Sequence, residues 1–229
     1  MRILKHLAIT PDGNRRYAKE HGLSFKQAYL KGFDKVKDVI EWSTEPKKIT
    51  FWALSLDNFV KRSSFELKIL FKLMQKHVEK SIENSEFAEK GVRVRFFGKR
   101  ELLPKSLNER FSRLEEETVG GSKELNIAVA YSGRDELLSA AKALAFDAKA
   151  GKVDLNKVDE NAFGNYLYFN ESPDLIIRTG DAPRLSGLLP WQAAYSEIYF
   201  SKKMWPEFEK NDYDDAIEFF HSVESRRGK

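Results

Sequence analysis

The sequence predicts an α/β fold: a single domain with a central, mostly parallel sheet covered by helices. Short apolar segments rich in β-branched and aromatic residues alternate along the chain with amphipathic helical segments. Most of the apolar segments are continuous rather than alternating, which is typical of strands buried on both faces. The length of 229 residues suits one domain, and no linker or repeat divides the chain, so we expect one domain over residues 1–229.

Apolar periodicity and the residues that interrupt it predict each element in turn. Strands are expected at 7–9, 49–55, 92–98, 125–131 and 175–177, each an apolar run that ends at polar or turn-forming residues. Helices are expected at 15–22, 25–45, 64–90, 107–118, 135–151 and 214–225. Pro46 ends the second helix and Gly91 the third, while the segment 191–200 is aromatic and apolar without an assigned element.

Composition excludes several classes of site. The chain has no cysteine, so it has no disulfide, thiolate metal site or cysteine nucleophile. Its formal net charge of +4 arises from interspersed basic and acidic residues, which argues against nucleic-acid binding and fits an anionic substrate. No signal peptide or membrane-length apolar run is visible, so we expect a cytoplasmic protein that is at most peripheral at the membrane.

Polar clusters follow four of the predicted strands, at 12–16, 55–58, 132–134 and 178–180. In parallel sheets, ligands bind outside the carboxyl ends of the strands. We therefore expect these clusters to meet at one edge of the sheet. Their convergence predicts a functional site better than any single cluster does.

The first cluster suits a phosphate group and a magnesium ion. Gly13 allows close approach of the backbone, and the helix that follows offers free N–H groups to an anion. Arg15 and Arg16 add charge-assisted donors, and Asp12 can hold Mg²⁺ against diphosphate oxygens. Taken alone, residues 11–14 indicate no more than a tight turn.

A second basic cluster contains Arg178, Arg184 and Ser186 within nine residues. It can form a second anion clamp, or it can be an exposed loop with unrelated charges. The sequence has no Gly-Lys-Ser/Thr phosphate loop and no Gly-x-Ser-x-Gly motif, which disfavours P-loop and hydrolase chemistry. The four histidines lack the spacing of metal ligands.

Taken together, the motifs resemble those of the cis-prenyltransferase family, which includes the undecaprenyl and dehydrodolichyl diphosphate synthases. The matching segments occur in order and span nearly the whole chain: 12–19, 55–59, 125–134, 178–186, 190–197, 199–200 and 205–208. The resemblance implies a Mg²⁺-dependent prenyltransferase, usually a homodimer, that joins an allylic prenyl diphosphate to isopentenyl diphosphate with cis geometry. Diphosphate is released.

The resemblance also implies roles for individual residues. Asp12 and Asn58 would be catalytic, Asp12 in diphosphate departure and Asn58 in proton removal, and Asp12 and Glu197 would hold the metal ion. Arg226 and Gly228 would reach a diphosphate in the neighbouring subunit. The other substrate-binding residues implied by the resemblance are Gly13, Asn14, Arg15, Arg16, Tyr17, Lys26, Tyr29, Ser55, Asp57, Phe59, Arg62, Arg178, Arg184 and Ser186. The helices 25–45 and 64–90 carry apolar faces that can line a prenyl channel, although core packing explains most of those residues.

Several positions depart from the family pattern near the substrates. An arginine and then a histidine are usual after the first helix, where this chain has Phe25 or Lys26 and then Tyr29. Asp57 replaces the usual glutamate, and the segment 181–183 also differs. These changes leave the fold prediction intact. They keep open a short-chain or single-step transfer to an atypical acceptor such as a phosphorylated alcohol.

A second alternative belongs to another functional class, a catalytically silent regulatory subunit. Such relatives tend to lose the Asp-Gly-Asn cluster, whereas Asp12, Asn14, Arg16, Arg178 and Arg184 are all present. The sequence therefore favours an active enzyme.

Overall fold

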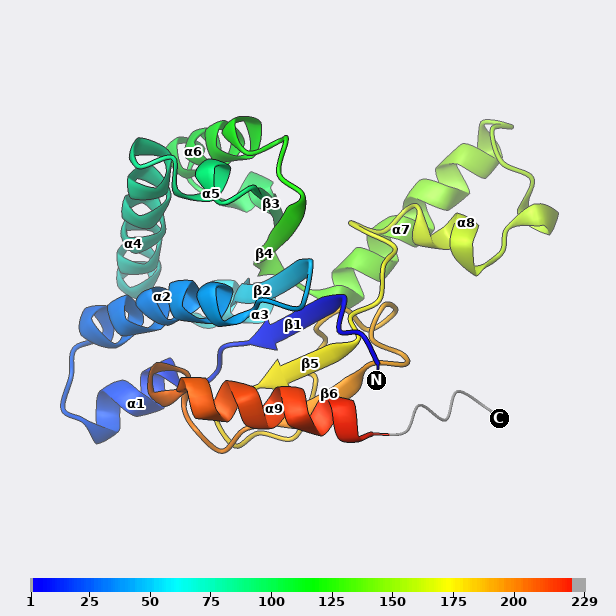
Figure 1. Ribbon diagram of the computed structural model, residues 1–229. Helices are drawn as coiled ribbons and strands as arrows, with labels where there is room; N and C mark the ends of the chain where they lie inside the picture. The colour runs from blue at the N-terminus through cyan, green and yellow to red at the C-terminus, as the bar shows by residue number, and fades with distance from the viewer. Residues whose placement is uncertain (1, 224–229) are drawn as a thin grey trace.

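A six-stranded sheet forms the centre of the computed structural model, which describes residues 2–223 (Figure 1). The strand order is β3-β4-β2-β1-β5-β6, and each pair of neighbours in it is parallel. The predicted parallel sheet is thus confirmed. The strands are β1 (His6–Thr10), β2 (Lys48–Ser55), β3 (Val92–Phe97), β4 (Lys123–Tyr131), β5 (Leu175–Arg178) and β6 (Glu197–Phe200).

Helices connect the strands from β1 to β5, as is usual for parallel pairing, and a loop without a helix, residues 179–196, joins β5 to β6. The helices are α1 (Asn14–Glu20), α2 (Phe25–Trp42), α3 (Leu56–Lys61), α4 (Ser64–Glu83), α5 (Glu86–Glu89), α6 (Lys105–Glu117), α7 (Gly133–Lys149), α8 (Glu160–Gly164) and α9 (Lys210–Ser222). Short 3₁₀ turns occur at Arg100–Leu102, Leu155–Lys157 and Trp205–Glu207.

Capping residues fix the starts of the two longest helices at the site. Ser24 accepts a hydrogen bond from the Gln27 N–H at the start of α2, and the Gln27 side chain accepts from the Ser24 N–H. Ser63 and Glu66 form the same reciprocal pair at the start of α4. Such a capping box satisfies backbone donors that a helix end leaves free, so both helix starts are well defined.

The predicted helix 64–90 is interrupted in the structure. It ends as α4 at Glu83, and the chain passes through Ser85 in a left-handed conformation with φ 48° before α5 begins. The structure also contains three elements that the sequence analysis did not assign, namely α3, α8 and β6.

Alternate residues of each strand face opposite layers. The residues of β1 divide in this way: Leu7 and Ile9 belong to the larger core and Ala8 to the smaller one. Residues from α2, α4, α6 and α9 pack on the larger core, and the loop residues Leu188 and Leu189 pack on the smaller one. The helices and this loop therefore seal the sheet on both faces and leave its carboxyl edge for a site.

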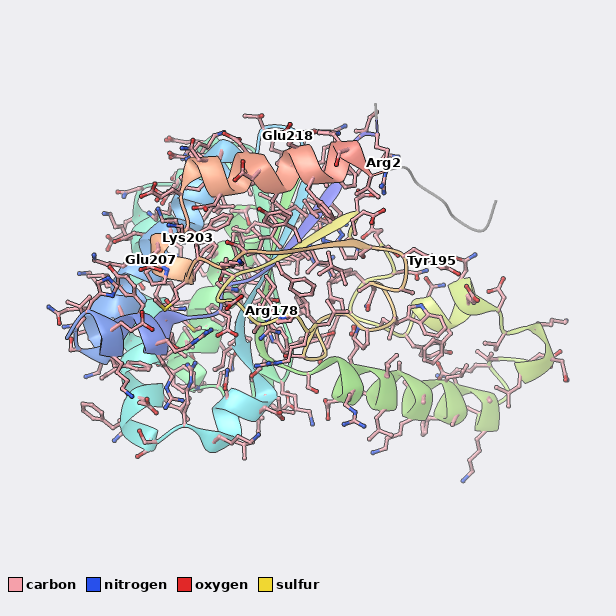
Figure 2. The ribbon with its side chains drawn as sticks, turned by 90° about the horizontal axis from the view of Figure 1, so that it is seen from below. Arg2, Arg178, Tyr195, Lys203, Glu207 and Glu218 are labelled. Carbon is pink, nitrogen blue, oxygen red and sulfur yellow. The ribbon has the colours of Figure 1, made fainter. Side chains whose placement is uncertain are left out.

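The helices α7 and α8 extend away from the sheet (Figure 1). Leu138 and Phe146 on α7 are 55% and 70% exposed. Tyr195, on the same side in Figure 2, is 75% exposed. Within residues 2–223, no helix has the length and apolar character needed to cross a bilayer.

Candidate active site

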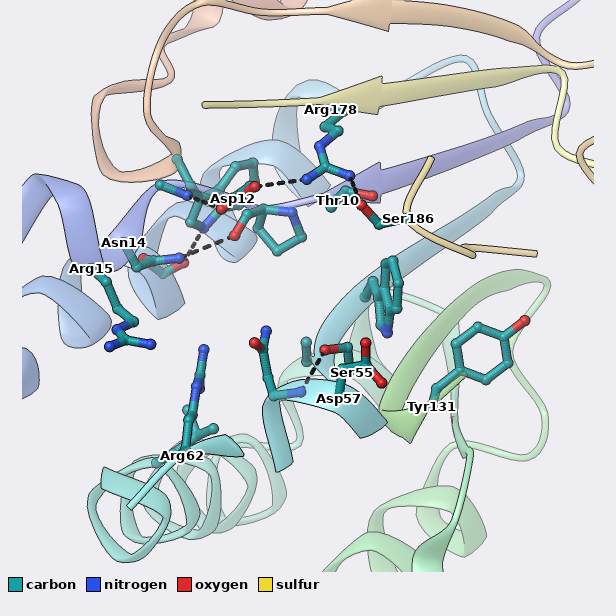
Figure 3. A pocket seen from close by; sticks show the side chains of 18 of the residues that line it. Thr10, Asp12, Asn14, Arg15, Ser55, Asp57, Arg62, Tyr131, Arg178 and Ser186 are labelled. Carbon is teal, nitrogen blue, oxygen red and sulfur yellow. Dashed lines mark hydrogen bonds and ion pairs between the residues drawn. The ribbon is translucent and has the colours of Figure 1, made fainter. Parts of the chain in front are cut away.

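The carboxyl ends of β1 and β5 bring two of the predicted clusters together. Thr10, the last residue of β1, is in register with Arg178, the last residue of β5. Arg178 therefore reaches the loop after β1, where its Nη2 donates to Asp12 Oδ2 at 2.8 Å (Figure 3). Its Nη1 donates to Ser186 Oγ at 2.7 Å and to the Arg184 carbonyl oxygen at 2.6 Å. These contacts fix a buried guanidinium at the rim of the site.

Asp12 is held by its backbone as well as by its side chain. Its carbonyl oxygen accepts hydrogen bonds from Thr179 Oγ1 at 2.8 Å and from the Trp205 N–H at 2.9 Å. Its Oδ1 accepts from the Gly13 N–H at 2.7 Å and lies 3.6 Å from a nitrogen of Arg16. The side chain keeps 36% of its surface exposed, so the carboxylate is oriented but accessible.

Gly13 allows the chain to turn into α1 at this point. Its φ of 108° belongs to the left-handed region, and a Cβ atom there would lie 2.8 Å from the side chain of Met204. Both features restrict the position to glycine. The fold itself therefore requires glycine at this position, and a close approach of its backbone to a ligand stays a prediction.

Asn14, the first residue of α1, is held against α2. Its Nδ2 donates to the Pro11 carbonyl oxygen at 3.1 Å, while its Oδ1 is buried and has no hydrogen-bond partner among the described residues. A Cβ atom on Gly32 would lie 2.4 Å from that Oδ1, so only glycine leaves room for it. Trp205 Nε1 in turn donates to the Gly32 carbonyl oxygen at 2.7 Å. Sequence reasoning assigned no role to Gly32 or Trp205.

The opposite wall of the site comes from α3 and its two ends. Ser55 caps the helix, since its Oγ accepts the Asn58 N–H at 3.0 Å. Asn58 and Arg62 line the cavity. Asp57 also lines it, but its side chain is 83% exposed and its carboxylate lies 3.8 Å from Lys61 Nζ. Ser55, Asp57 and Arg62 lie across the site from Asp12 and Asn14 (Figure 3).

The clusters enclose a cavity of about 690 Å³. Its charged lining residues are mostly basic: Arg15, Arg16, Lys61, Arg62, Arg134, Arg178 and Arg184 against Asp12 and Asp57. A second group of lining residues is aromatic or aliphatic: Tyr29, Phe33, Val36, Trp52, Ala53, Leu70, Tyr131 and Trp205. A basic surface joined to an apolar one suits a substrate that carries both an anionic head and a hydrocarbon tail.

Three residues expected to bind substrate do not line this cavity. Tyr17 is buried between α1 and α2, where its Oη accepts a hydrogen bond from Lys31 Nζ at 3.0 Å. Lys26 is exposed on the first turn of α2. Phe59 packs against the core, with its ring centroid 6.3 Å from that of Phe71. Within one chain, these positions serve packing or face solvent.

The structure also separates Glu197 from Asp12. Glu197 is the first residue of β6 and is in register with Leu175, which is in register with Leu7. Asp12 follows Leu7 by five residues, a distance of roughly 16 Å along the strands at about 3.3 Å per residue. Glu197 instead pairs with Arg2 at 2.8 Å, and Figure 2 shows Arg2 well apart from Arg178. Within a single chain the two carboxylates therefore lie too far apart to hold one metal ion, and the metal role of Glu197 stays a prediction.

Two predicted residues, Arg226 and Gly228, lie outside the described residues. Conversely, the cavity includes Trp52, Tyr131 and Arg134, which the sequence analysis did not name as site residues. The polar cluster 132–134 pointed to this part of the rim.

Trp52 and Tyr131 lay inside predicted strands and carried no separate signal. The indole of Trp52 is buried, and its Nε1 has no partner among the described residues. Tyr131 Oη donates to Glu136 Oε2 at 2.7 Å. Burial raises the pKa of the Glu136 carboxyl above its ordinary value, although its hydrogen bond from Tyr131 opposes that shift.

The donor set at Asp12 fits a magnesium ion that binds mainly through its substrate. Among residues 2–223, no three His, Cys, Asp or Glu side chains lie close enough to form a complete protein cage for a metal. Magnesium commonly uses one or two carboxylates together with substrate phosphates and water. Asp12 is an oriented, accessible carboxylate among basic residues that can hold those phosphates.

Comparisons of sequence agree with this site. The model of the prenyltransferase family, described as undecaprenyl diphosphate synthase, matches residues 10–228. A tritrans,polycis-undecaprenyl-diphosphate synthase (geranylgeranyl-diphosphate specific) from Thermoplasma volcanium is 40% identical over 230 residues, covering 98% of this chain and 89% of the relative. An isoprenyl transferase from Thermus thermophilus is 39% identical over 234 residues, with the same coverage of both chains.

Comparisons of structure lead to the same family. Lavandulyl diphosphate synthase from Lavandula x intermedia, solved with dimethylallyl diphosphate, has a TM-score of 0.93 at 28% identity and covers 99% of this chain and 98% of its own. A probable undecaprenyl diphosphate synthase from Campylobacter jejuni has a TM-score of 0.82 at 29% identity, with full coverage of both chains. The chain therefore belongs to the cis-prenyltransferase (undecaprenyl diphosphate synthase) family.

Proposed function

We propose that this protein joins an allylic prenyl diphosphate to isopentenyl diphosphate, forms a cis double bond and releases diphosphate. The observation that carries the proposal is the cavity of about 690 Å³, which combines a basic rim with an apolar wall around one accessible aspartate. The names of the relatives, which include polycis-undecaprenyl diphosphate synthases, support the same reaction.

The reaction breaks the bond between C1 of the allylic substrate and its diphosphate oxygen. C4 of isopentenyl diphosphate forms a bond to C1 of the allylic substrate. Loss of a proton from C2 of isopentenyl diphosphate then creates the new double bond. Negative charge grows on the departing diphosphate, so fixed cations around it lower the barrier. Arg15, Arg16 and Arg62 all line the cavity and suit this leaving group.

The basic cluster on the β5 side of Asp12 suits the second substrate, isopentenyl diphosphate. Arg178 is fixed there with Ser186 and Arg184, and Arg184 itself lines the cavity. This cluster can hold the diphosphate group of isopentenyl diphosphate. That group is not the leaving group and stays attached to the product. Asn58 also lines the cavity, and we propose that it assists the departure of the proton.

We also propose that the reaction depends on Mg²⁺ held by Asp12 and diphosphate oxygens. A bound magnesium ion would neutralise charge on the leaving diphosphate. Removal of divalent ions with EDTA should abolish product formation, and added Mg²⁺ should restore it. Full activity in EDTA would contradict the dependence.

The decisive experiment incubates the protein with allylic diphosphates of increasing length, with and without isopentenyl diphosphate, and identifies the products by mass spectrometry. Products that grow by five-carbon units only when isopentenyl diphosphate is present would support the proposal. A product formed from one allylic diphosphate alone, or with a phosphorylated alcohol, would instead support the short-chain or single-step alternative. Two observations favour testing this alternative. Tyr29, on which Phe25 stacks, lines the cavity, and the fold is similar to that of lavandulyl diphosphate synthase.

We propose that the enzyme acts as a homodimer formed through the extended arm of α7 and α8. The arm exposes Leu138 and Phe146, and exposed apolar surface of this kind commonly marks a protein interface. Light scattering should give the mass of two chains. Replacing Leu138 and Phe146 with glutamate should reduce that mass to one chain.

We further propose a cytoplasmic enzyme that contacts membranes only peripherally, where its lipid product leaves. Val60 and Phe65, which flank Arg62 in sequence, are 73% and 70% exposed and can touch a bilayer surface. Cosedimentation with lipid vesicles should weaken when both residues are replaced with serine.

A further inference from the structure

Arg62 lies at the junction of two helices that fix its backbone. It follows the last residue of α3, and its N–H donates to the Asn58 carbonyl oxygen at 3.0 Å. Ser63, the next residue, caps α4. The arginine side chain beyond this fixed backbone is long and flexible, and holding it in one place costs up to about 2 kcal/mol of conformational entropy. An anion site built on Arg62 therefore needs something to hold the guanidinium.

Neutral groups from α2 hold that guanidinium. Its Nη2 donates to Tyr29 Oη at 2.6 Å. Its central carbon lies 5.2 Å from the ring centroid of Tyr29 and 5.9 Å from that of Phe25. The two rings are stacked on each other, with their centroids 4.2 Å apart and an interplanar angle of 26°. The hydrogen bond and the aromatic surface together restrict the position of Arg62.

The charge of Arg62 is left without an ion pair in the part of the chain that the structure describes. Among residues 2–223, no carboxylate forms an ion pair with it. The two acidic residues nearest to it in sequence lie beside other cations: Glu66 is 3.8 Å from Arg15, and Asp57 is 3.8 Å from Lys61. The Nε and Nη1 atoms of Arg62 are buried and have no hydrogen-bond partner among the described residues. A fixed cation with unused donors beside a cavity is an anion-binding group.

Tyr29 remains a neutral hydroxyl in this place. Burial raises the pKa of the Tyr29 hydroxyl above its ordinary value of 10.0, although the nearby Arg62 and Arg15 oppose that shift. The hydroxyl is therefore protonated throughout the neutral range. It accepts the hydrogen bond from Arg62 without cancelling the positive charge, which a carboxylate at this position would do.

We propose that Tyr29 is a positioning residue that holds the Arg62 guanidinium, with the help of the Phe25 ring, for the diphosphate of the allylic substrate. The assignment to that substrate rests on the proposed function, because Arg62 points toward Asn14 and Arg15 (Figure 3). Tyr29 acts through Arg62, and the effect of removing its hydroxyl depends on the arginine being present.

A double-mutant cycle tests this dependence directly. Binding of inorganic pyrophosphate in the presence of Mg²⁺ is measured by calorimetry for the wild type, Tyr29→Phe, Arg62→Gln and the double variant. Loss of the hydroxyl should weaken binding about tenfold when Arg62 is present, as expected for a hydrogen bond to a charged group. In the Arg62→Gln background the same change should alter binding by less than about twofold, because positioning no longer matters.

Tyr199→Phe is the matched control, since Tyr199 lies on β6 and does not line the cavity. It should bind pyrophosphate like the wild type. Phe25→Leu removes the stacked ring but keeps the hydrogen bond, and it should weaken binding in the same direction, again only when Arg62 is present. The KM for the allylic substrate should rise in parallel, while the KM for isopentenyl diphosphate should change little.

Several results would overturn the proposal. Equal losses in both backgrounds would mean that Tyr29 acts independently of Arg62. Unchanged binding in Tyr29→Phe, or a wild type that does not bind pyrophosphate, would also reject it. Failure of the proposed function is recognised separately, because it would appear as absent prenyl product even when the pyrophosphate cycle shows the expected coupling.

Discussion

Replacing Gly32 with alanine tests whether the contact between α1 and α2 sets the geometry of the active site. The new Cβ atom would lie 2.4 Å from Asn14 Oδ1 and 3.1 Å from Trp205 Cδ1. The first distance is too short for any real contact, so Asn14 must move. The hydrogen bond that Asn14 Nδ2 donates to the Pro11 carbonyl oxygen, now 3.1 Å long, must then stretch or break.

The expected change in stability is small because two effects oppose each other. Inserting a methyl group into a packed contact costs about 1–3 kcal/mol. Alanine inside a helix is more favourable than glycine by about 1 kcal/mol. The free energy of unfolding should therefore fall by no more than about 2 kcal/mol, which a urea titration can measure.

The effect on catalysis should be larger than the effect on folding. When a residue that lines the active site moves by about an ångström, the rate can fall on the order of 10²-fold. We expect kcat/KM for the allylic substrate to fall at least tenfold in Gly32→Ala. Gly120→Ala is the control, because a Cβ atom there meets nothing within 4 Å. Wild-type kcat/KM in a folded Gly32→Ala protein would refute the role of this contact.

Three further predictions concern single side chains. Asp12→Asn should lower kcat by about 10²-fold or more, because it removes the carboxylate charge that would hold a magnesium ion beside the leaving diphosphate; near-normal turnover in saturating Mg²⁺ would contradict the role of Asp12. Arg178→Lys should raise the KM for isopentenyl diphosphate about tenfold, since an ammonium cannot reproduce the fork that now reaches Asp12 and Ser186; a changed kcat with an unchanged KM would count against this site. Burial, with a contribution from Lys48, lowers the pKa of His6 from 6.5 to about 4, so the protein should lose about 3 kcal/mol of stability as the pH falls from 6.5 to 4. Urea titrations should show a smaller loss in His6→Gln, and equal losses in both proteins would rule out His6 as the cause.

The strand-end clusters could be predicted because the rule behind them depends only on strand direction. Parallel strands place their carboxyl ends at one edge, so Asp12 and Arg178 were expected to meet before their contact was known. The register between Thr10 and Arg178 is what makes the contact direct. Their pairing at 2.8 Å could not be predicted, since register depends on packing across the whole sheet.

The break between α4 and α5 had only a weak local signal, the turn-forming pair Asn84 and Ser85. The apolar spacing of 64–90 continues through Ser85, and no glycine or proline marks the turn there. Serine adopts the left-handed conformation found at Ser85 only with some strain, so tertiary packing imposes it. Propensity arguments cannot anticipate a conformation of this kind.

The separation of Glu197 from Asp12 within one chain has a physical cause. A sequence motif shows which residues occur together along the chain but not on which side of the sheet they emerge. The segment 191–200 was not recognised as containing a strand, although β6 begins at Glu197. Had β6 been assigned as parallel, Glu197 would have been expected at the amino edge, opposite to Asp12.

The helix α2 shows why an apolar stripe alone cannot distinguish a core from a substrate channel. Tyr29, Phe33 and Val36 recur at helical spacing and line the cavity, whereas Val39 on the same helix is fully buried in the core. Both environments favour apolar residues, so the stripe fits either. The informative positions are those that a plain core would not select, namely a tyrosine with a hydrogen-bonded hydroxyl and Gly32, which leaves space for Asn14. Polar side chains and glycines within an otherwise apolar helix face are therefore the features by which sequence analysis can locate a channel.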